Sequence, residues 1–495
     1  MKKIIATALT LGLAVGSFAA CTPSTPATPS ESKETPAETE ESKPVETTEA
    51  SQMTDAEEDN VLNIMSFTEE VPGMIKAYFD AHPDVAGKYE LRKQVVATDG
   101  GGYQTALDAA LAAGGADAPD IYCAEDAFVA KYSKGDGAQF AAPYAALGID
   151  VDKEIADAKI ANYSVELGTR DSDGAVVALA YQATGCAMIY RRDIAKDVFG
   201  TDDPATIKAE CGPGMDKFFE AAEKCKGKGY AMISALGDLW NMCKANTDVK
   251  SGWVDASGNL VIDPQREAFL DYAKKIIDNG YSNDASAWSE SWYADMAGTG
   301  PKQVFCFLGP AWLINYVMAG NSGSWKETGE KDADGNPIKE LDTSIGTYGK
   351  WAVTDSPLGF YWGGTYILAN KDTDKATLVG DIIRYITLDT SEDGLQYKWA
   401  NGLLSDDGTK DTVASAVVMD KSDGKVAFLA DQNMFDVFGP AGDFATGKLA
   451  TPYDEDINRL FNDQVTAYSH GEKDRDAAIK DFKTAVSEQV GVNVG

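Results

Sequence analysis

Tryptophans set beside carboxylates and glycines are the side chains of this sequence best suited to holding a ligand. Indole rings offer flat apolar faces, and carboxylates accept several hydrogen bonds from hydroxyl groups. The densest group is Phe360-Tyr361-Trp362-Gly363-Gly364, which precedes the strand-like run 365–368. Because glycine lets a backbone bend or approach a ligand closely, we interpret 355–370 as a strand that crosses between two lobes and carries ligand contacts. An ordinary strand with an edge tryptophan is the alternative.

Polar residues directly after predicted strands form a second set of candidates. Glu125 and Asp126 follow the apolar run 118–124. Ligand-binding groups of open α/β sheets gather at the carboxyl ends of their strands. These two side chains are therefore expected to line a binding site.

The sequence favours binding over catalysis. It has two histidines and contains no His-Glu-x-x-His, Gly-x-Ser-x-Gly or Cys-x-x-Cys motif. Asp332, Asp334 and Asn336 suggest calcium, but Pro337 stands where an EF-hand needs glycine, so a hairpin turn at 334–335 is expected. We predict no cofactor and no metal. A surface glycosidase with paired carboxylates remains the less favoured alternative.

The first 60 residues predict export and a tether. Residues 1–20 have the charged start and short apolar run of a signal peptide. Phe18-Ala-Ala-Cys21 resembles the bacterial lipoprotein box, which implies lipidation of Cys21. Residues 21–60 are rich in Ser, Thr, Pro and Glu, so we expect a disordered spacer. A plain secretory peptide is the alternative.

The net charge and the hydropathy of the sequence limit the kinds of partner that the protein can bind, and its cysteines leave one question open. The net charge of -34 argues against nucleic acid or anionic lipid. No later segment is long and apolar enough to span a bilayer, so membrane contact is expected through the lipid anchor only. Of the six cysteines after Cys21, a disulfide among Cys211, Cys225 and Cys243 is left open.

Alternating strand and helix patterns after residue 60 predict an α/β fold. The run 61–67 precedes a helix whose apolar face is Met74, Ile75, Tyr78 and Phe79. A strand at 91–97, a helix from Tyr103 and the strand 118–124 follow, which implies a parallel, doubly wound sheet. The roughly 435 residues after the tether exceed one core, so two lobes are expected.

An ordered series of motifs resembles the extracellular solute-binding proteins of ABC importers, in particular the carbohydrate-binding group that includes maltose-binding protein. The runs are Pro119-Asp-Ile121, Gly174-Ala-Val-Val-Ala-Leu-Ala-Tyr181, Cys186-Ala-Met-Ile-Tyr190-Arg-Arg-Asp193, Lys302-Gln-Val-Phe-Cys-Phe-Leu-Gly-Pro-Ala-Trp312 and the glycine pair 363–364. Ala180, Arg191-Arg192 and Ala311 depart from the family pattern. Ala311 places Trp312 one residue later than in the maltose binder.

The resemblance implies a periplasmic-binding-protein fold of two lobes, each a mostly parallel sheet flanked by helices, joined by hinge crossings. Lobe 1 is expected at 61–182 and 361–430, lobe 2 at 183–360, and the C-terminal helices of 431–495 mainly on lobe 2. The ligand-binding residues that it implies, together with those above, are Thr68, Glu69, Glu125, Asp126, Gln182, Asp238, Trp240, Trp292, Trp312, Trp362, Gly363, Gly364 and Tyr453.

The function implied is that of a monomeric, lipid-anchored receptor on the outer face of the cell membrane. It would bind a sugar or oligosaccharide between the lobes and deliver it to the permease subunits of an ABC importer. Trp312 and Trp362 are expected to face one ligand from opposite lobes. The same fold binding a non-sugar solute such as a polyamine is the alternative.

Overall fold

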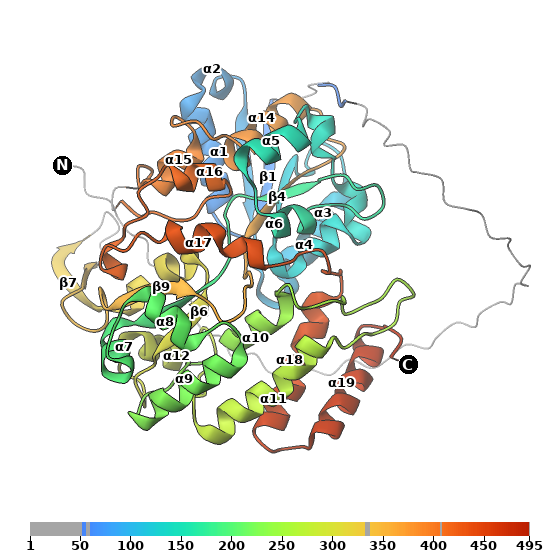
Figure 1. Ribbon diagram of the computed structural model, residues 1–495. Helices are drawn as coiled ribbons and strands as arrows, with labels where there is room; N and C mark the ends of the chain where they lie inside the picture. The colour runs from blue at the N-terminus through green and yellow to red at the C-terminus, as the bar shows by residue number, and fades with distance from the viewer. Residues whose placement is uncertain (1–51, 56–59, 332–336, 406–407, 495) are drawn as a thin grey trace, which may run out of the picture.

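The computed structural model describes residues 52–55, 60–331, 337–405 and 408–494. The predicted signal peptide, Cys21, most of the predicted tether and the turn at 334–335 lie outside these residues. Residues 52–55 were expected in the tether but lie against lobe 1, where the Met53 amide donates to the Ala146 carbonyl. The described chain forms two lobes, one above the other in Figure 1.

Lobe 1 is built on a five-stranded mixed sheet. Its strands, in spatial order, are β2 (Glu90–Val95), β1 (Val61–Ser66), β3 (Ile121–Glu125), β10 (Thr365–Ala369) and β4 (Ala178–Ala180). β1 is parallel to β2 and β3, whereas β10 is antiparallel to β3 and β4. Alternate residues of β10 therefore enter the two apolar cores on opposite faces of the sheet, Ile367 on one and Tyr366 on the other.

Helices cover both faces of this sheet. The α-helices are α1 (Glu70–Ala81), α2 (Pro83–Ala86), α3 (Gly102–Ala113), α4 (Asp126–Ser133), α5 (Val151–Ala158), α6 (Asn162–Leu167) and α14 (Ala376–Thr387). Short 3-10 helices lie at η1 (Asp99–Gly101), η2 (Asp136–Phe140) and η3 (Tyr144–Leu147). The predicted apolar face of α1 is confirmed, because Met74, Ile75, Tyr78 and Phe79 are all buried against α14 and the sheet.

Lobe 2 contains a smaller sheet, β6 (Cys306–Gly309), β5 (Ala187–Arg191) and β9 (Trp351–Asp355). Both strand pairs are antiparallel, which corrects the expectation of a mostly parallel sheet here. The reason is connectivity: β5 carries the chain away from lobe 1 and β9 carries it back, so the two run in opposite directions. Parallel bridges, Ala231 to Val304 and Ile233 to Ser282, extend the sheet through residues 231–233.

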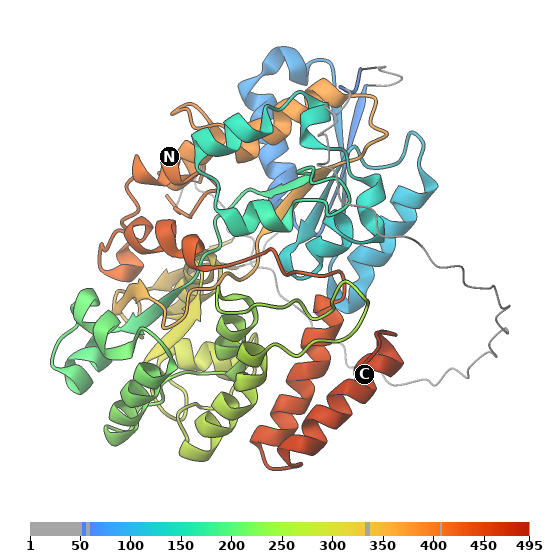
Figure 2. The same cartoon turned by 45° about the vertical axis from the view of Figure 1, so that its right-hand side comes forward.

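The helices of lobe 2 also form two layers. They are α7 (Arg192–Phe199), α8 (Pro204–Cys211), α9 (Met215–Gly227), α10 (Leu236–Ala245), α11 (Pro264–Asn279), α12 (Glu290–Ala297), η4 (Leu313–Met318), α13 (Ala319–Asn321), α18 (Asp454–Ser469) and α19 (Arg475–Gln489). Figure 2 shows α18 and α19, in red, beside the green helices of this lobe. An antiparallel ribbon of β7 (Ser324–Lys331) and β8 (Pro337–Asp342) projects from the lobe.

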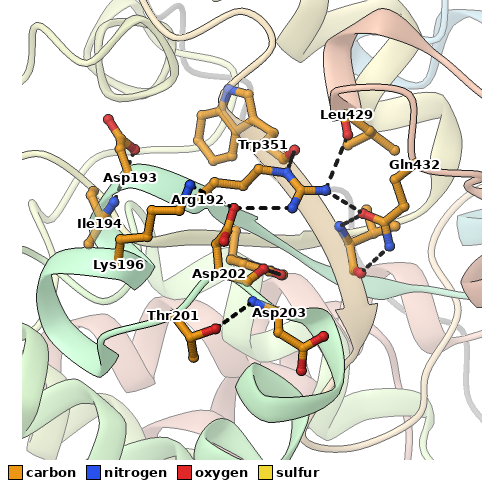
Figure 3. A network of polar contacts seen from close by, with 12 residues as sticks. Arg192, Asp193, Ile194, Lys196, Thr201, Asp202, Asp203, Trp351, Leu429 and Gln432 are labelled. Carbon is orange, nitrogen blue, oxygen red and sulfur yellow. Dashed lines mark hydrogen bonds and ion pairs between the residues drawn. The ribbon is translucent and has the colours of Figure 1, made fainter.

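Residues 395–444 run between the lobes. They contain α15 (Leu395–Ala400), α16 (Ala416–Asp420), η5 (Ala427–Leu429), α17 (Phe435–Ala441) and η6 (Gly442–Phe444). Figure 3 shows how Arg192 fastens this segment to lobe 2. Its guanidinium donates to the carbonyls of Trp351 at 2.9 Å and Leu429 at 3.3 Å, and Gln432 completes the contact by bonding both backbone groups of Val353.

Three backbone crossings join the lobes, at 181–186, 356–364 and 441–450. The first two touch through a bridge between Gly185 and Tyr361. In the third, the Thr446 amide donates to the Ala245 carbonyl of lobe 2, while the Gly447 amide donates to the Glu166 carboxylate of lobe 1. Gly185 of the first crossing also packs on Ala441 and Gly442 of the third. The three crossings therefore form one packed unit between the lobes.

No disulfide bond forms among the described cysteines. Cys123, Cys186, Cys211, Cys225, Cys243 and Cys306 are all free and buried. Loss of hydration raises the pKa of each thiol, so these side chains act as small apolar core residues. Within the described residues, no helix is both long and apolar enough to cross a membrane.

Candidate functional site

The Gly363-Gly364 turn lies where the second crossing meets both lobes. Both residues have positive φ, 73° and 116°, which a residue with a Cβ adopts at a cost. The Gly364 carbonyl accepts from the Asp126 amide at 3.0 Å, and the Gly363 carbonyl accepts from the Thr184 hydroxyl at 2.8 Å. The turn therefore fixes the first residue of α4 relative to the first crossing.

Tryptophans gather against this turn. The Trp312 indole donates to the Trp362 carbonyl at 3.1 Å, and the centroids of the two rings are 4.8 Å apart. Trp288 lies parallel to Trp312, with ring centroids 6.2 Å apart and planes inclined by 7°. We call Trp288, Trp312 and Trp362 the tryptophan platform. Trp292, expected to bind the ligand, is instead a fully buried core residue that packs against Trp288, which corrects its assignment.

The platform belongs to lobe 2, which corrects one expectation. Trp312 and Trp362 both pack on the same apolar core of that lobe, so they do not face each other from opposite lobes. The indole hydrogen bond to the Trp362 carbonyl holds the end of the crossing against lobe 2. The expected shift of Trp312 by Ala311 does not remove it from this region, because its ring lies within 3.2 Å of a Cβ placed on Gly363.

Charged groups from both lobes also meet around a cavity that Asp126 lines. The cavity has a volume of about 40 Å³, and its charged lining residues are Asp126 of α4, Lys244 of α10, Arg266 of α11 and Asp454 of α18. Such a volume holds only a few water molecules. A solute that reaches these charges must therefore enter while the lobes stand further apart. We call this cavity the charged pocket.

Its cations are not neutralised by direct pairing. Among the described residues, the Lys244 ammonium forms no hydrogen bond or ion pair. Arg266 is 3% exposed, donates to the carbonyls of Lys244 and Ser251, and lies over the Trp253 ring at 4.8 Å. These contacts fix the guanidinium in place without cancelling its charge.

The surroundings of two acids in the site, Glu125 and Asp126, disfavour their charged forms. Loss of hydration raises the pKa of both Glu125 and Asp126, and repulsion by Asp126 raises that of Glu125 further. Lys244 opposes both shifts. Glu125 also caps α4, accepting from the Ala127 amide at 2.7 Å. Hydroxyl donors placed here would stabilise the charged carboxylates.

Four other predicted residues lie near the cleft in different roles. Glu69 is exposed and pairs with Lys93 at 2.7 Å, and the Thr68 hydroxyl is enclosed without a partner among the described residues. Tyr453 precedes α18 and is 42% exposed. Gln182 is buried and donates to the Asp411 carboxylate at 3.0 Å, so its amide serves the packing of the first crossing.

Asp238 and Trp240 are core residues, which corrects their assignment to the cleft. Trp240 is 5% exposed and packs among Trp253, Phe269 and Phe461. Asp238 is 1% exposed on the same helix, and burial raises its pKa to about 7. Helix α10 is enclosed on most of its circumference, so these side chains face the interior of lobe 2.

The sequence missed three functional candidates. Trp288 lies near Trp292 in a polar segment of the sequence, but its place on the platform depends on Trp312, which is distant in sequence. Lys244 and Arg266 gave no signal, because each occupies an ordinary polar position of a helix. No group of three or more His, Cys, Asp or Glu side chains in the described chain could hold a metal ion.

Comparisons with known proteins agree with this fold. No family model and no curated protein matches the sequence. Among solved structures, an extracellular solute-binding protein of family 1 covers 87% of this chain and 99% of its own, at a TM-score of 0.65 and 18% identity. The sugar-binding protein MalE of Xanthomonas citri has a TM-score of 0.61 and 13% identity, with coverages of 86% and 96%.

A third similar structure is the galacto-N-biose/lacto-N-biose I-binding protein of an ABC transporter from Bifidobacterium longum, in complex with lacto-N-biose. Its TM-score is 0.60 at 14% identity, and the match covers 88% of this chain and 98% of that one. The two-lobed α/β fold of solute-binding proteins, predicted from the sequence, is therefore confirmed.

Proposed function

We propose that this protein is an extracellular receptor that binds a sugar or oligosaccharide between its lobes and delivers it to an ABC importer. The observation that carries the proposal is the tryptophan platform beside Asp126, at the crossing that joins the two lobes. Sugars have apolar C–H faces, which suit indole rings, and hydroxyl rims, which suit carboxylates. The solved structures with a similar fold include proteins that bind lacto-N-biose and β-1,6-galactobiose, which supports this class of solute.

The charged pocket favours a neutral solute over a cationic one. Carboxylates alone would suit a polyamine, but Lys244 and Arg266 lie among them and would repel it. A hydroxyl group can donate to a carboxylate and accept from an ammonium or guanidinium at the same time. A neutral polyol can therefore hydrogen-bond to both the carboxylates and the cations of the pocket. A polyamine can bind only the carboxylates and is repelled by the cations.

The place of action follows from the first residues of the chain. The signal peptide and Cys21 support anchoring to the outer face of the cell membrane by lipid alone. From there a monomeric receptor would present its closed form to the permease subunits, because closure of the lobes around a solute is the change a partner can detect.

Isothermal titration calorimetry tests the binding class. The solutes are lacto-N-biose, β-1,6-galactobiose and tagatose, with spermidine as the polycation. We expect a sugar to bind, and Asp126→Asn to weaken it by about tenfold, the effect of losing one charge-assisted hydrogen bond. Asp117→Asn is the matched control, because Asp117 is an acid of the same lobe with a fully exposed side chain.

Two results would contradict the proposal. Binding of spermidine alone, weakened by Asp126→Asn, would establish the polyamine alternative. Sugar binding that Asp126→Asn and Asp117→Asn affect equally would place the sugar elsewhere on the protein.

A further inference from the structure

A helical segment of lobe 2, formed by η4 and α13, begins at Trp312 of the tryptophan platform and has one side open to solvent. Between Ala311 and Gly320 the chain passes through η4 and α13, and its side chains alternate between burial and exposure at helical spacing. Trp312, Tyr316 and Gly320 are the accessible positions at intervals of four, while Leu313, Ile314, Val317 and Met318 are buried. Residues four apart share one helix face, so these three lie in a row.

Tyr316 marks the point where this row leaves the cleft. Its side chain is 55% exposed. Burial raises the pKa of the Tyr316 hydroxyl, and the nearby Glu70 carboxylate of lobe 1 raises it further. Tyr316 therefore lies beside lobe 1 while more than half of its side chain stays open to solvent.

Trp325 extends the row beyond the helix. It is the second residue of β7 on the projecting ribbon, and its side chain is 53% exposed. Its indole donates to the Gly320 carbonyl at 2.9 Å, and its ring lies 3.9 Å from a Cβ placed on Gly320. The hydrogen bond fixes the exposed indole at the end of the row that starts at Trp312.

We propose that the row Trp312, Tyr316 and Trp325 forms added subsites for a long oligosaccharide that extends out of the cleft onto the ribbon. This inference rests on the proposed function and specifies its solute by length. The row from Trp312 to Gly320 covers about two helical turns, most of them in the π-helix η4, and so is longer than a single sugar ring. Successive rings with open faces at that spacing suit successive units of a chain, because each unit presents an apolar face. A contiguous row of exposed aromatics marks an interaction site, whereas singly scattered ones do not.

The test is calorimetry with maltooligosaccharides and β-1,6-galactooligosaccharides of two to six units. In the unaltered protein, affinity should rise with chain length. Trp325→Ala should weaken binding of the six-unit chain by about tenfold, the effect of exposing roughly 60 Å² of covered ring, and leave the two-unit chain unchanged. Trp325→Phe should restore most of the loss because it keeps an aromatic face.

Leu403→Ala is the matched control, since Leu403 is 66% exposed and lies outside the row. Thermal unfolding should be the same for all variants. Affinity that does not depend on chain length, or a length dependence that survives Trp325→Ala, would overturn the added subsites and leave the proposed function intact. Absence of binding for both series would overturn the added subsites, whereas the proposed function is decided separately by the titrations with lacto-N-biose, tagatose and spermidine.

Discussion

Gly185 is the residue at which a single methyl group should disturb the hinge most. It belongs to the first crossing and packs directly on the third. A Cβ at this position would lie 2.8 Å from the Ala441 carbonyl carbon and closer still to the Gly442 amide nitrogen. Both neighbours are backbone atoms, so no change of rotamer can relieve the contact.

The cost of Gly185→Ala follows from that geometry. Ordinary van der Waals contact begins at 3.4 Å, so the crossings must separate by about 0.6 Å or more. Overpacking of this kind costs about 1–3 kcal/mol. Because the same crossings position Gly363 and Asp126, we also expect weaker solute binding, by about tenfold, in the fraction that remains folded.

Urea unfolding and calorimetry measure the two effects. The matched control is Gly73→Ala in α1, where a Cβ would meet nothing within 4 Å. That change should be neutral or stabilising by about 0.5–1 kcal/mol, since alanine favours the helix. Equal stability and affinity for both variants would refute the view that the crossings form one tightly packed hinge.

Three further outcomes are expected. Burial raises the pKa of Asp238 and of Asp411 to about 7, far above the unfolded value near 3.9, so the stability that these two carboxyls contribute is fully present below about pH 4 and is lost as pH rises through 7; urea unfolding of Asp238→Asn across this range should show a smaller loss with rising pH than the unaltered protein. Trp312→Ala should lower sugar affinity by ~30- to 1000-fold and cost about 1 kcal/mol of stability through the lost indole hydrogen bond, whereas Trp240→Ala should cost about 3–5 kcal/mol of stability. Cys21→Ala should release the protein from membranes, which fractionation and immunoblotting would show.

Periodicity predicted the elements that one stretch of chain determines. The strand predicted at 365–368 is β10, and the helix face predicted after residue 70 is buried as expected. Both depend on side-chain spacing of two or about 3.6 residues, which is local information. The direction of strand pairing in lobe 2 is different, because it depends on which crossing each strand continues.

Tryptophan placement shows why the site was predicted only in part. Trp240 and Trp312 both follow a strand-like run, yet Trp240 is enclosed by α11 and α18 while Trp312 lies on the platform. The difference lies in which helix covers each side chain, and those helices lie far away in sequence. Lys244 and Arg266 were missed for the same reason, since their pocket exists only once α4, α10, α11 and α18 are assembled.

The position of the glycine turn explains how one solute could act on both lobes. A ligand shifts a conformational equilibrium only through contacts that differ between the states. The turn is bonded to lobe 1 through Asp126 and touches lobe 2 through Trp312. A sugar stacked on the platform lies within reach of Asp126 only when α4 is held against this turn. The hydrogen bonds of its hydroxyl groups would then be complete in the closed form alone. Their free energy would therefore stabilise the closed form relative to the open one.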